Sequence, residues 1–493
     1  MLEVVKIIPN WINKRKDNKQ IFLLLLGLFF LVACSAFPLR DQSLSLTSTP
    51  NVIVLPTTAR LTPAIELSTS LPDLASLVSQ TAVPAAIPTQ LKTTPAATIT
   101  ATITEGNSWS AHPGVSADGR FVVFESNASN LVADDQNNVT DIFVYDRVLG
   151  MMQRVSVAGD GSEATHANTQ ATISADGSLI AFSSQSGNLV PGDTNNRPDI
   201  FVHNRVTGST ERVSVASNGS QSNGQFTHSP VISADGRSVL FVSDATNLSD
   251  ILLPHQGNHL FVHDLDSRQT TLVDVNSENI PANGDSLWAD ISADGRFVVF
   301  TSWASNLTSD TPTEATGRLF VHDRVTGITK LIGEGIAQAI SANGRYVAYL
   351  RTVENEGVYL FIYDWKSAAE TQVSWIASGI HGRPGTNEVN MSADGRYVVF
   401  RGVGRNEVTN EEKSYTDIFL YDQVEGSIEL ISVDSHNMPA NSGSGHPDIS
   451  DDGNWVVFDS NANNLVNNDT NEETDVFIRE IANSKTWRIP VLR

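Results

Sequence analysis

The chain has 493 residues, 55 acidic and 32 basic side chains, a formal net charge of −23 and a single cysteine. The acidic excess argues against a nucleic-acid partner, because phosphate binding requires clustered lysine and arginine. One cysteine excludes a disulfide framework. A hydrophobic fraction of 40% is enough to build a sizeable core, so most of the chain is expected to fold.

The first segment has the pattern of a targeting signal. Basic residues at 14–16 and 19 precede an apolar run over residues 21–33, which is followed by Cys34. The run is too short for a spanning helix, which needs about 20 residues. Its end, Leu31-Val32-Ala33-Cys34, resembles the bacterial lipobox, which implies cleavage before Cys34 and attachment of diacylglycerol to the sulfur. The alternative is a signal anchor that is never cleaved. We therefore expect a signal peptide at 1–33 and an extracytoplasmic protein held on a membrane by its lipid.

Residues 34–107 are expected to form a disordered tether that begins with the lipidated Cys34. The segment is rich in Thr, Pro, Ala and Ser, and it has no aromatic residue between Pro38 and Ser108. Such a composition cannot bury enough apolar surface to offset the entropy of ordering the chain.

Residues 108–493 contain one phrase seven times, with small variations: Ser-Ala-Asp-Gly-Arg. We call its serine the signature serine; it stands at Ser116, Ser174, Ser233, Ser292, Ser341, Ser392 and Ser450. Each phrase is followed by an apolar run such as Phe121-Val122-Val123-Phe124, and two more strand-like runs complete the unit. With the short stretch before the serine, every unit holds four strand candidates and no helical period.

Four strands with an Asp-Gly hairpin between the first two are typical of a propeller blade. We therefore predict an all-β, seven-bladed β-propeller of four-stranded antiparallel blades over residues 108–493. The repeated phrase resembles the signature of the TolB-like propeller family, which is related to the WD repeats. The resemblance implies the fold, but it does not make the chain TolB, which has six blades and an amino-terminal α/β domain. The scaffold itself serves binding proteins, lyases and peptidase domains alike.

The loops between strands differ in length on the two faces of the predicted propeller. The turns between first and second strands and between third and fourth strands are tight, whereas the other loops usually exceed ten residues. The long-loop face is therefore the expected binding face, although long loops can also be tolerated insertions.

Three blades share an Asp-x-Asn-x-x-x-Asp pattern in the loop between second and third strands, which we call the acidic frame. Its members are Asp135, Asn137 and Asp141; Asp193, Asn195 and Asp199; and Asp469, Asn471 and Asp475. Alternate Asp and Asn residues are how short loops offer oxygen ligands to calcium, which makes these nine residues candidate metal ligands. In the alternative interpretation, the frame forms Asx turns without an ion.

A second candidate site lies where the first strand of each blade begins, four residues before the signature serine. We call these positions the channel mouth. In three neighbouring blades they hold His446, His112 and Gln170. Histidine is a common metal ligand and acid–base group, but a solvated polar rim is the simpler interpretation. We expect His203, His263 and His322 to be packing residues, because other blades have tyrosine in that strand position.

These observations favour a lipid-anchored, extracytoplasmic binding or scaffold protein of the cell envelope. We expect it to be monomeric and to engage a protein or glycan partner through the long-loop face, with calcium as the candidate cofactor. No Gly-x-Ser-x-Gly, P-loop or His-Glu-x-x-His motif occurs in the sequence. The alternative function is a metal-dependent carbohydrate-active enzyme, a polysaccharide lyase or hydrolase, that uses the channel mouth.

Overall fold

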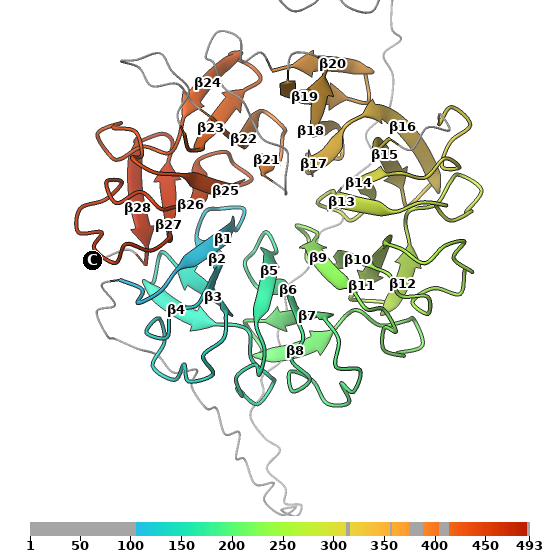
Figure 1. Ribbon diagram of the computed structural model, residues 1–493, viewed down its shortest axis with the longest axis horizontal. Coiled ribbons are helices and arrows are strands. Elements are labelled where there is room, and N and C mark those ends of the chain that lie inside the picture. Colours follow the sequence, from blue (N-terminus) through green and yellow to red (C-terminus); the bar gives the residue numbers. More distant parts are fainter. Residues whose placement is uncertain (1–104, 312–315, 355–356, 374–387, 404–413, 491–493) are drawn as a thin grey trace, which may run out of the picture. The chain divides into compact units, whose positions relative to one another are not determined.

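The computed structural model describes residues 105–311, 316–354, 357–373, 388–403 and 414–490. These residues form 28 strands in seven sheets, and each sheet consists of four antiparallel strands that are consecutive in the chain. Figure 1 shows the seven sheets as blades around one axis, with the first strand of each blade innermost. The predicted seven-bladed β-propeller is confirmed.

The blades follow one another in chain order. Blades one to four consist of β1 (Ser110–Val115), β2 (Phe121–Ser126), β3 (Asp141–Asp146) and β4 (Met151–Arg154); β5 (Asn168–Ile173), β6 (Leu179–Ser184), β7 (Asp199–Asn204) and β8 (Ser209–Arg212); β9 (Thr227–Ile232), β10 (Ser238–Ser243), β11 (His259–Asp264) and β12 (Gln269–Leu272); and β13 (Ser286–Ile291), β14 (Phe297–Ser302), β15 (Arg318–Asp323) and β16 (Ile328–Glu334). Blades five to seven consist of β17 (Ile336–Ile340), β18 (Tyr346–Val353), β19 (Gly357–Asp364) and β20 (Ala369–Gln372); β21 (Val389–Met391), β22 (Tyr397–Gly402), β23 (Asp417–Asp422) and β24 (Ser427–Leu430); and β25 (Ser444–Ile449), β26 (Trp455–Ser460), β27 (Asp475–Glu480) and β28 (Lys485–Ile489).

The predicted signal peptide, Cys34 and the tether as far as residue 104 lie outside the described residues. Within the described ranges, no helix has the length and apolar character needed to cross a membrane.

The signature phrase forms the turn between the first two strands of each blade. In blade one, the Ser116 hydroxyl donates to Asp118 (2.8 Å) and accepts from the amide of Phe121 (2.9 Å). Gly119 has φ = +70°, a conformation that glycine adopts without steric cost. The serine, aspartate and glycine of the phrase are therefore the residues that shape this turn.

The same turns join neighbouring blades. The amide of Ala117 donates to the carbonyl of Ala175 in the next blade (3.0 Å), and equivalent bonds link most successive turns around the axis. A Cβ atom on Gly119 would lie 2.1 Å from the ring of Trp455 in blade seven, so only glycine allows this close approach. Glycine thus serves both the turn and the contact between blades.

The ring closes between blades seven and one without a shared strand among the described residues, because β25–β28 form a sheet of their own. The amide of Ser110 donates to the carbonyl of Thr474 (2.8 Å). The guanidinium of Arg147 lies 3.6 Å from the ring centroid of Trp455. Side-chain contacts and single hydrogen bonds therefore hold this junction.

Candidate functional site

The channel mouth is built on a bulge in the innermost strands. In β1, the register with β2 shifts between Ala111 and Gly114, and His112 has φ = +51°. Positive φ recurs at the same position in four other blades, at Gln170, Ser229, Trp288 and His446. Positive φ is rare for bulky residues, so the bulge fixes these side chains at the start of each first strand, on the long-loop face.

His112 and His446 lie side by side at the mouth, with ring centroids 4.0 Å apart. Each imidazole is paired with a carboxylate at the end of its neighbouring second strand. Nδ1 of His112 lies 3.2 Å from Oε2 of Glu125, and Nδ1 of His446 lies 2.8 Å from Oδ2 of Asp459. The two carboxylates are almost fully buried, whereas the His112 side chain is 47% exposed. The histidines therefore face solvent and their carboxylates lie behind them.

The two carboxylates also connect the blades. Asp459 accepts from the amide of His112 (3.0 Å), and Glu125 accepts from the amide of Gln170 (2.6 Å). In turn, the side-chain oxygen of Gln170 accepts from the amide of Ser229 (2.9 Å). The predicted residues His446, His112 and Gln170 are thus brought together in one hydrogen-bonded arc.

The arc favours a protonated imidazole at His112. The hydrogen bond to Glu125 raises the pKa of His112 against the opposing effect of burial, and the charges of Glu125, Asp459 and Glu388 raise it further. Glu388 is at the channel-mouth position of blade six and forms an ion pair with Arg401. Charged side chains of three consecutive blades, six, seven and one, therefore lie within electrostatic range of His112.

Further along the axis, two first strands carry an acidic residue two positions before the signature serine. Burial raises the pKa of Asp448 to about 7 and that of Asp290 to about 6. Each carboxylate accepts a backbone amide from the next blade, that of Val115 at 2.9 Å for Asp448 and that of Ile340 at 2.8 Å for Asp290. These carboxyl groups tie neighbouring blades together through backbone hydrogen bonds.

Blade four presents an aromatic pair at the mouth. Trp288 occupies the channel-mouth position with φ = +46°, and its ring centroid lies 5.4 Å from that of Trp303. Both indoles are partly exposed. Aromatic rings of this kind offer an apolar surface together with an N–H donor, so the mouth combines charged and aromatic groups.

The acidic frames of blades one, two and seven each enclose an arginine from the fourth strand. In blade one, Nη1 of Arg154 lies 3.3 Å from Asp135, 3.7 Å from Asp141 and 2.5 Å from Glu163, which lies in the loop between β4 and β5. Asn137 donates to Asp141 (2.8 Å) and accepts from the amide of Val139 (3.3 Å), as an Asx turn would.

Blade two repeats this arrangement with a neutral partner from the loop between β8 and β9. Nη1 of Arg212 lies 3.1 Å from Asp193 and 3.6 Å from Asp199. Asn195 donates to Asp199 (2.9 Å), as Asn137 does to Asp141. In the position of Glu163, Gln221 accepts from the amide of Thr194 (3.3 Å).

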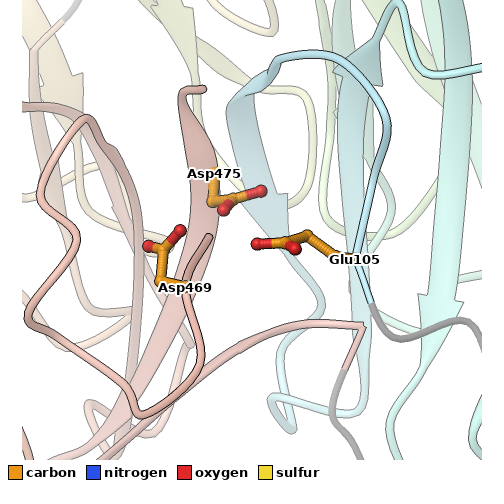
Figure 2. Close-up of side chains that lie close together, drawn as sticks. All are labelled: Glu105, Asp469 and Asp475. Atoms are coloured by element: carbon orange, nitrogen blue, oxygen red, sulfur yellow. The ribbon is translucent and has the colours of Figure 1, made fainter. Parts of the chain in front are cut away.

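In blade seven the acidic partner comes from the other end of the described chain. Figure 2 shows Glu105, Asp469 and Asp475 converging, and one carboxylate oxygen of each lies within 4.8 Å of the others. Nη1 of Arg488 lies 2.7, 3.4 and 3.2 Å from these three residues. Asn471 donates to Asp475 (3.4 Å). Composition places Glu105 in the tether, but this residue helps to close the ring of blades.

Burial raises the pKa of carboxyl groups in all three frames, against the opposing effect of the arginine. Burial raises the pKa of Asp135 and of Asp475 to about 6, even though an arginine lies beside each. Burial also raises the pKa of Asp141, Asp199 and Asp469. Calcium binding stays a prediction. The guanidinium, which was not expected from the sequence, lies beside the carboxylate oxygens that would bind calcium and would compete with the ion for them.

The histidines of the third strands are core residues, as expected. His203, His263 and His322 are at most 5% exposed, and burial lowers the pKa of each to about 4. Each shares a hydrogen bond with a threonine of the fourth strand, at 2.9, 2.8 and 2.9 Å respectively. They hold strands together and take no part in the mouth.

Comparison with known proteins gives a fold and no family. No protein family and no curated protein matches the sequence. Among solved structures, TolB from Acinetobacter baumannii is 16% identical, with 69% of this chain and 66% of that chain covered and a TM-score of 0.39. The β-propeller domain of the trilobed protease from Pyrococcus furiosus, described as having an open velcro topology, is 13% identical over 77% and 97% of the two chains, with a TM-score of 0.48. An oligogalacturonate lyase in complex with manganese is 10% identical over 76% and 90%, with a TM-score of 0.46.

The likeness is distant and concerns the propeller alone. The chain is structurally similar to TolB-like propellers and to the propellers of the prolyl oligopeptidase family. At identities below 20%, this likeness carries no function from any of these proteins to the present one.

The groups that surround the candidate residues were not predicted, although their positions in the repeat follow two patterns. Glu125 and Asp459 lie nine residues after the signature serine, where blades two and four have serine and threonine. Arg154, Arg212 and Arg488 lie 38 residues after it, in the same three blades that carry the acidic frame. Aligning the seven repeats residue by residue would have shown both patterns.

Proposed function

We propose that the protein is a lipid-anchored extracytoplasmic binding protein that holds a protein or glycan partner of the cell envelope at the channel mouth. The observation that carries this proposal is the arc of His446, His112 and Gln170, backed by Asp459 and Glu125. The backing carboxylates are fixed by backbone amides of the next blade, so the arc is ordered before any partner binds.

The neighbouring aromatic pair supports the same proposal. Trp288 and Trp303 provide apolar rings beside hydrogen-bonding groups, which is the combination found in protein hot spots and in sites that stack sugars. The signal-like segment ending at Cys34 supports the location in the envelope. The formal charge of −23 means that an anionic membrane surface would repel the protein, so the lipid would have to supply the attachment.

Binding is tested by comparing variants on opposite faces of the propeller. The full chain, the variant Glu125→Gln/Asp459→Asn and the variant Val325→Ser are each probed against an envelope polysaccharide array and against solubilised envelope proteins. Val325 is 74% exposed at a turn of the opposite face, so it serves as the control. We expect the mouth variant to lose at least about tenfold in affinity, equivalent to about 1.4 kcal/mol, while the control binds normally. Loss of binding in the control alone would contradict the proposal.

A carbohydrate-active enzyme at the same mouth is the second candidate. It is favoured by the raised pKa of His112, since a histidine that gains a proton beside a carboxylate can act as an acid or base. The residues also fit a metal, because each Nδ1 faces a carboxylate, as in metal-binding imidazoles. The Nε2 atoms of His112 and His446 would then be the ligands, and the ion would polarise an oxygen of the substrate. Turnover of an acidic polysaccharide that disappears in His112→Gln would establish this candidate, whereas unchanged turnover would remove it.

A further inference from the structure

Blade three differs from blades one, two and six at one pair of positions within the repeat. The third strand begins with Asp141, Asp199 and Asp417 in blades one, two and six, and each aspartate accepts from a serine hydroxyl 15 residues later. In blade three the strand begins with His259, and Asp274 takes the place of the serine. Both members of the pair have changed together, so that an imidazole and a carboxylate replace a carboxylate and a hydroxyl.

The buried carboxylate fixes the tautomer of His259. Oδ2 of Asp274 lies 2.8 Å from Nδ1 of His259, and Oδ1 of Asp274 accepts from the amide of Leu260 (3.2 Å). His259 and Asp274 are 1% and 0% exposed. A buried carboxylate requires donors, so Nδ1 of His259 carries the proton and Nε2 holds a free lone pair.

That lone pair points to a second histidine. Nε2 of His259 lies 3.0 Å from Nδ1 of His255, in the loop before β11, and the ring centroids are 4.6 Å apart. On the other side of His255, Nε2 is buried and has no hydrogen-bond partner among the described residues. Its nearest charged neighbour is Oδ1 of Asp285, 3.6 Å away.

Neither neutral tautomer of His255 satisfies this geometry. With the proton on Nδ1, His255 donates to Nε2 of His259, but its buried Nε2 is left as an acceptor 3.6 Å from Oδ1 of Asp285, which already accepts from the amide of Asn258. With the proton on Nε2, the bare Nδ1 faces the lone pair of His259. A cation between the two rings, either an added proton or a metal ion, removes the conflict, because His259 and His255 then each direct a ring N–H toward a carboxylate, Asp274 or Asp285.

We propose that His255 and His259 bind a divalent transition-metal ion of the kind that prefers imidazole, such as zinc, through Nδ1 and Nε2 respectively. Tetrahedral zinc with nitrogen at about 2.0–2.1 Å separates two such ligands by about 3.3 Å, so the present 3.0 Å needs to widen by only a few tenths of an ångström. The His255 side chain is 25% exposed, so water can supply the remaining ligands. This site is separate from the channel mouth, and it does not depend on the proposed function.

Zinc binding is measured by calorimetric titration of the full chain without a histidine tag, with Cys34→Ser throughout to remove the thiol. We expect one zinc ion per chain, which is lost in His255→Gln and weakened about tenfold in Asp285→Asn, the usual effect of removing a supporting carboxylate. His436→Gln is the control for surface histidines, because this side chain is 85% exposed, and it should bind zinc normally. Cobalt substituted for zinc should give the visible bands of a tetrahedral site in the parent and none in His255→Gln.

A second variant distinguishes the loss of zinc binding from misfolding. His259→Asp/Asp274→Ser restores the pair that blades one, two and six already use, so it should fold and melt like the parent but bind no zinc. The proposal is overturned by the absence of stoichiometric zinc binding at about 100 μM, by binding that survives in this double variant or in His255→Gln, or by binding that is lost in His112→Gln instead.

Discussion

Replacing Gly119 by alanine should destabilise the junction between blades seven and one. The added Cβ would lie 2.1 Å from Cδ1 and 2.4 Å from Cγ of Trp455. The indole cannot simply move away, because the guanidinium of Arg147 lies on its ring at 3.6 Å. A matched control is Gly208→Ala, since Gly208 has φ = +73° and open space around the position of a Cβ.

The two substitutions share the backbone strain and differ in packing. A non-glycine residue in the left-handed region costs about 1–2 kcal/mol, and this cost applies to both. Overpacking adds about 1–3 kcal/mol for Gly119→Ala alone. We therefore expect Gly119→Ala to lower the free energy of unfolding by about 2–5 kcal/mol and Gly208→Ala by about 1–2 kcal/mol.

Urea denaturation of the full chain measures this difference, provided that the slopes of the transitions agree. Trp455→Leu in the Gly119→Ala background should recover part of the loss, because Leu179 already packs beside Gly236 in the equivalent place. Equal midpoints for Gly119→Ala and Gly208→Ala would refute the idea that close packing of glycine on an aromatic ring holds the junction.

Three further predictions concern the charged groups. Arg154→Gln leaves the acidic frame of blade one without its cation and should lower the free energy of unfolding by about 3–5 kcal/mol. Millimolar calcium should restore part of this loss. If a chelator lowers the melting temperature of the parent chain, calcium already occupies the native frame. Glu105→Ala removes the contacts to Thr470 and Arg488 and should cost about 1–3 kcal/mol in denaturant melts, and an unchanged melt would show that the junction does not need it. Because the pKa of His112 is raised above 6.5, its stabilising effect is complete below that pH and is lost as the pH rises through the folded-state pKa. His112→Gln should therefore destabilise the protein more at pH 5.5 than at pH 9, and an equal effect at both would contradict the pairing with Glu125.

The sequence predicted the propeller because its signals are local. The signature turn depends on residues within five positions of one another, as Ser116 and Phe121 show, and its sevenfold recurrence sets the number of blades. The channel-mouth residues were also found, since their position relative to the signature serine is fixed by the bulge.

The partners of these residues could not be read in the same way, because they come from other strands and other blades. Asp459 reaches His112 across the closing junction, and Glu105 reaches Arg488 from the opposite end of the described chain. The acidic frame suggested an ion because its three oxygens are local, whereas the arginine that lies among them is supplied by the fourth strand. Pairing of this kind is decided by tertiary structure, which a single sequence does not reveal.

Within the described residues the ring closes without a shared strand, and this has a consequence for how the number of blades can change in evolution. Each blade is one uninterrupted stretch of the chain, so a duplication or deletion of one repeat in the gene adds or removes a complete sheet. In a propeller whose last sheet includes a strand from the other end of the chain, one blade is encoded by two separate parts of the gene. Duplication or deletion of either part would leave that sheet incomplete. The contacts at this junction include a glycine turn against an aromatic ring and an acidic residue ahead of the first strand. Gain or loss of one repeat would therefore change the number of blades by a whole unit and leave the strands of the other blades intact.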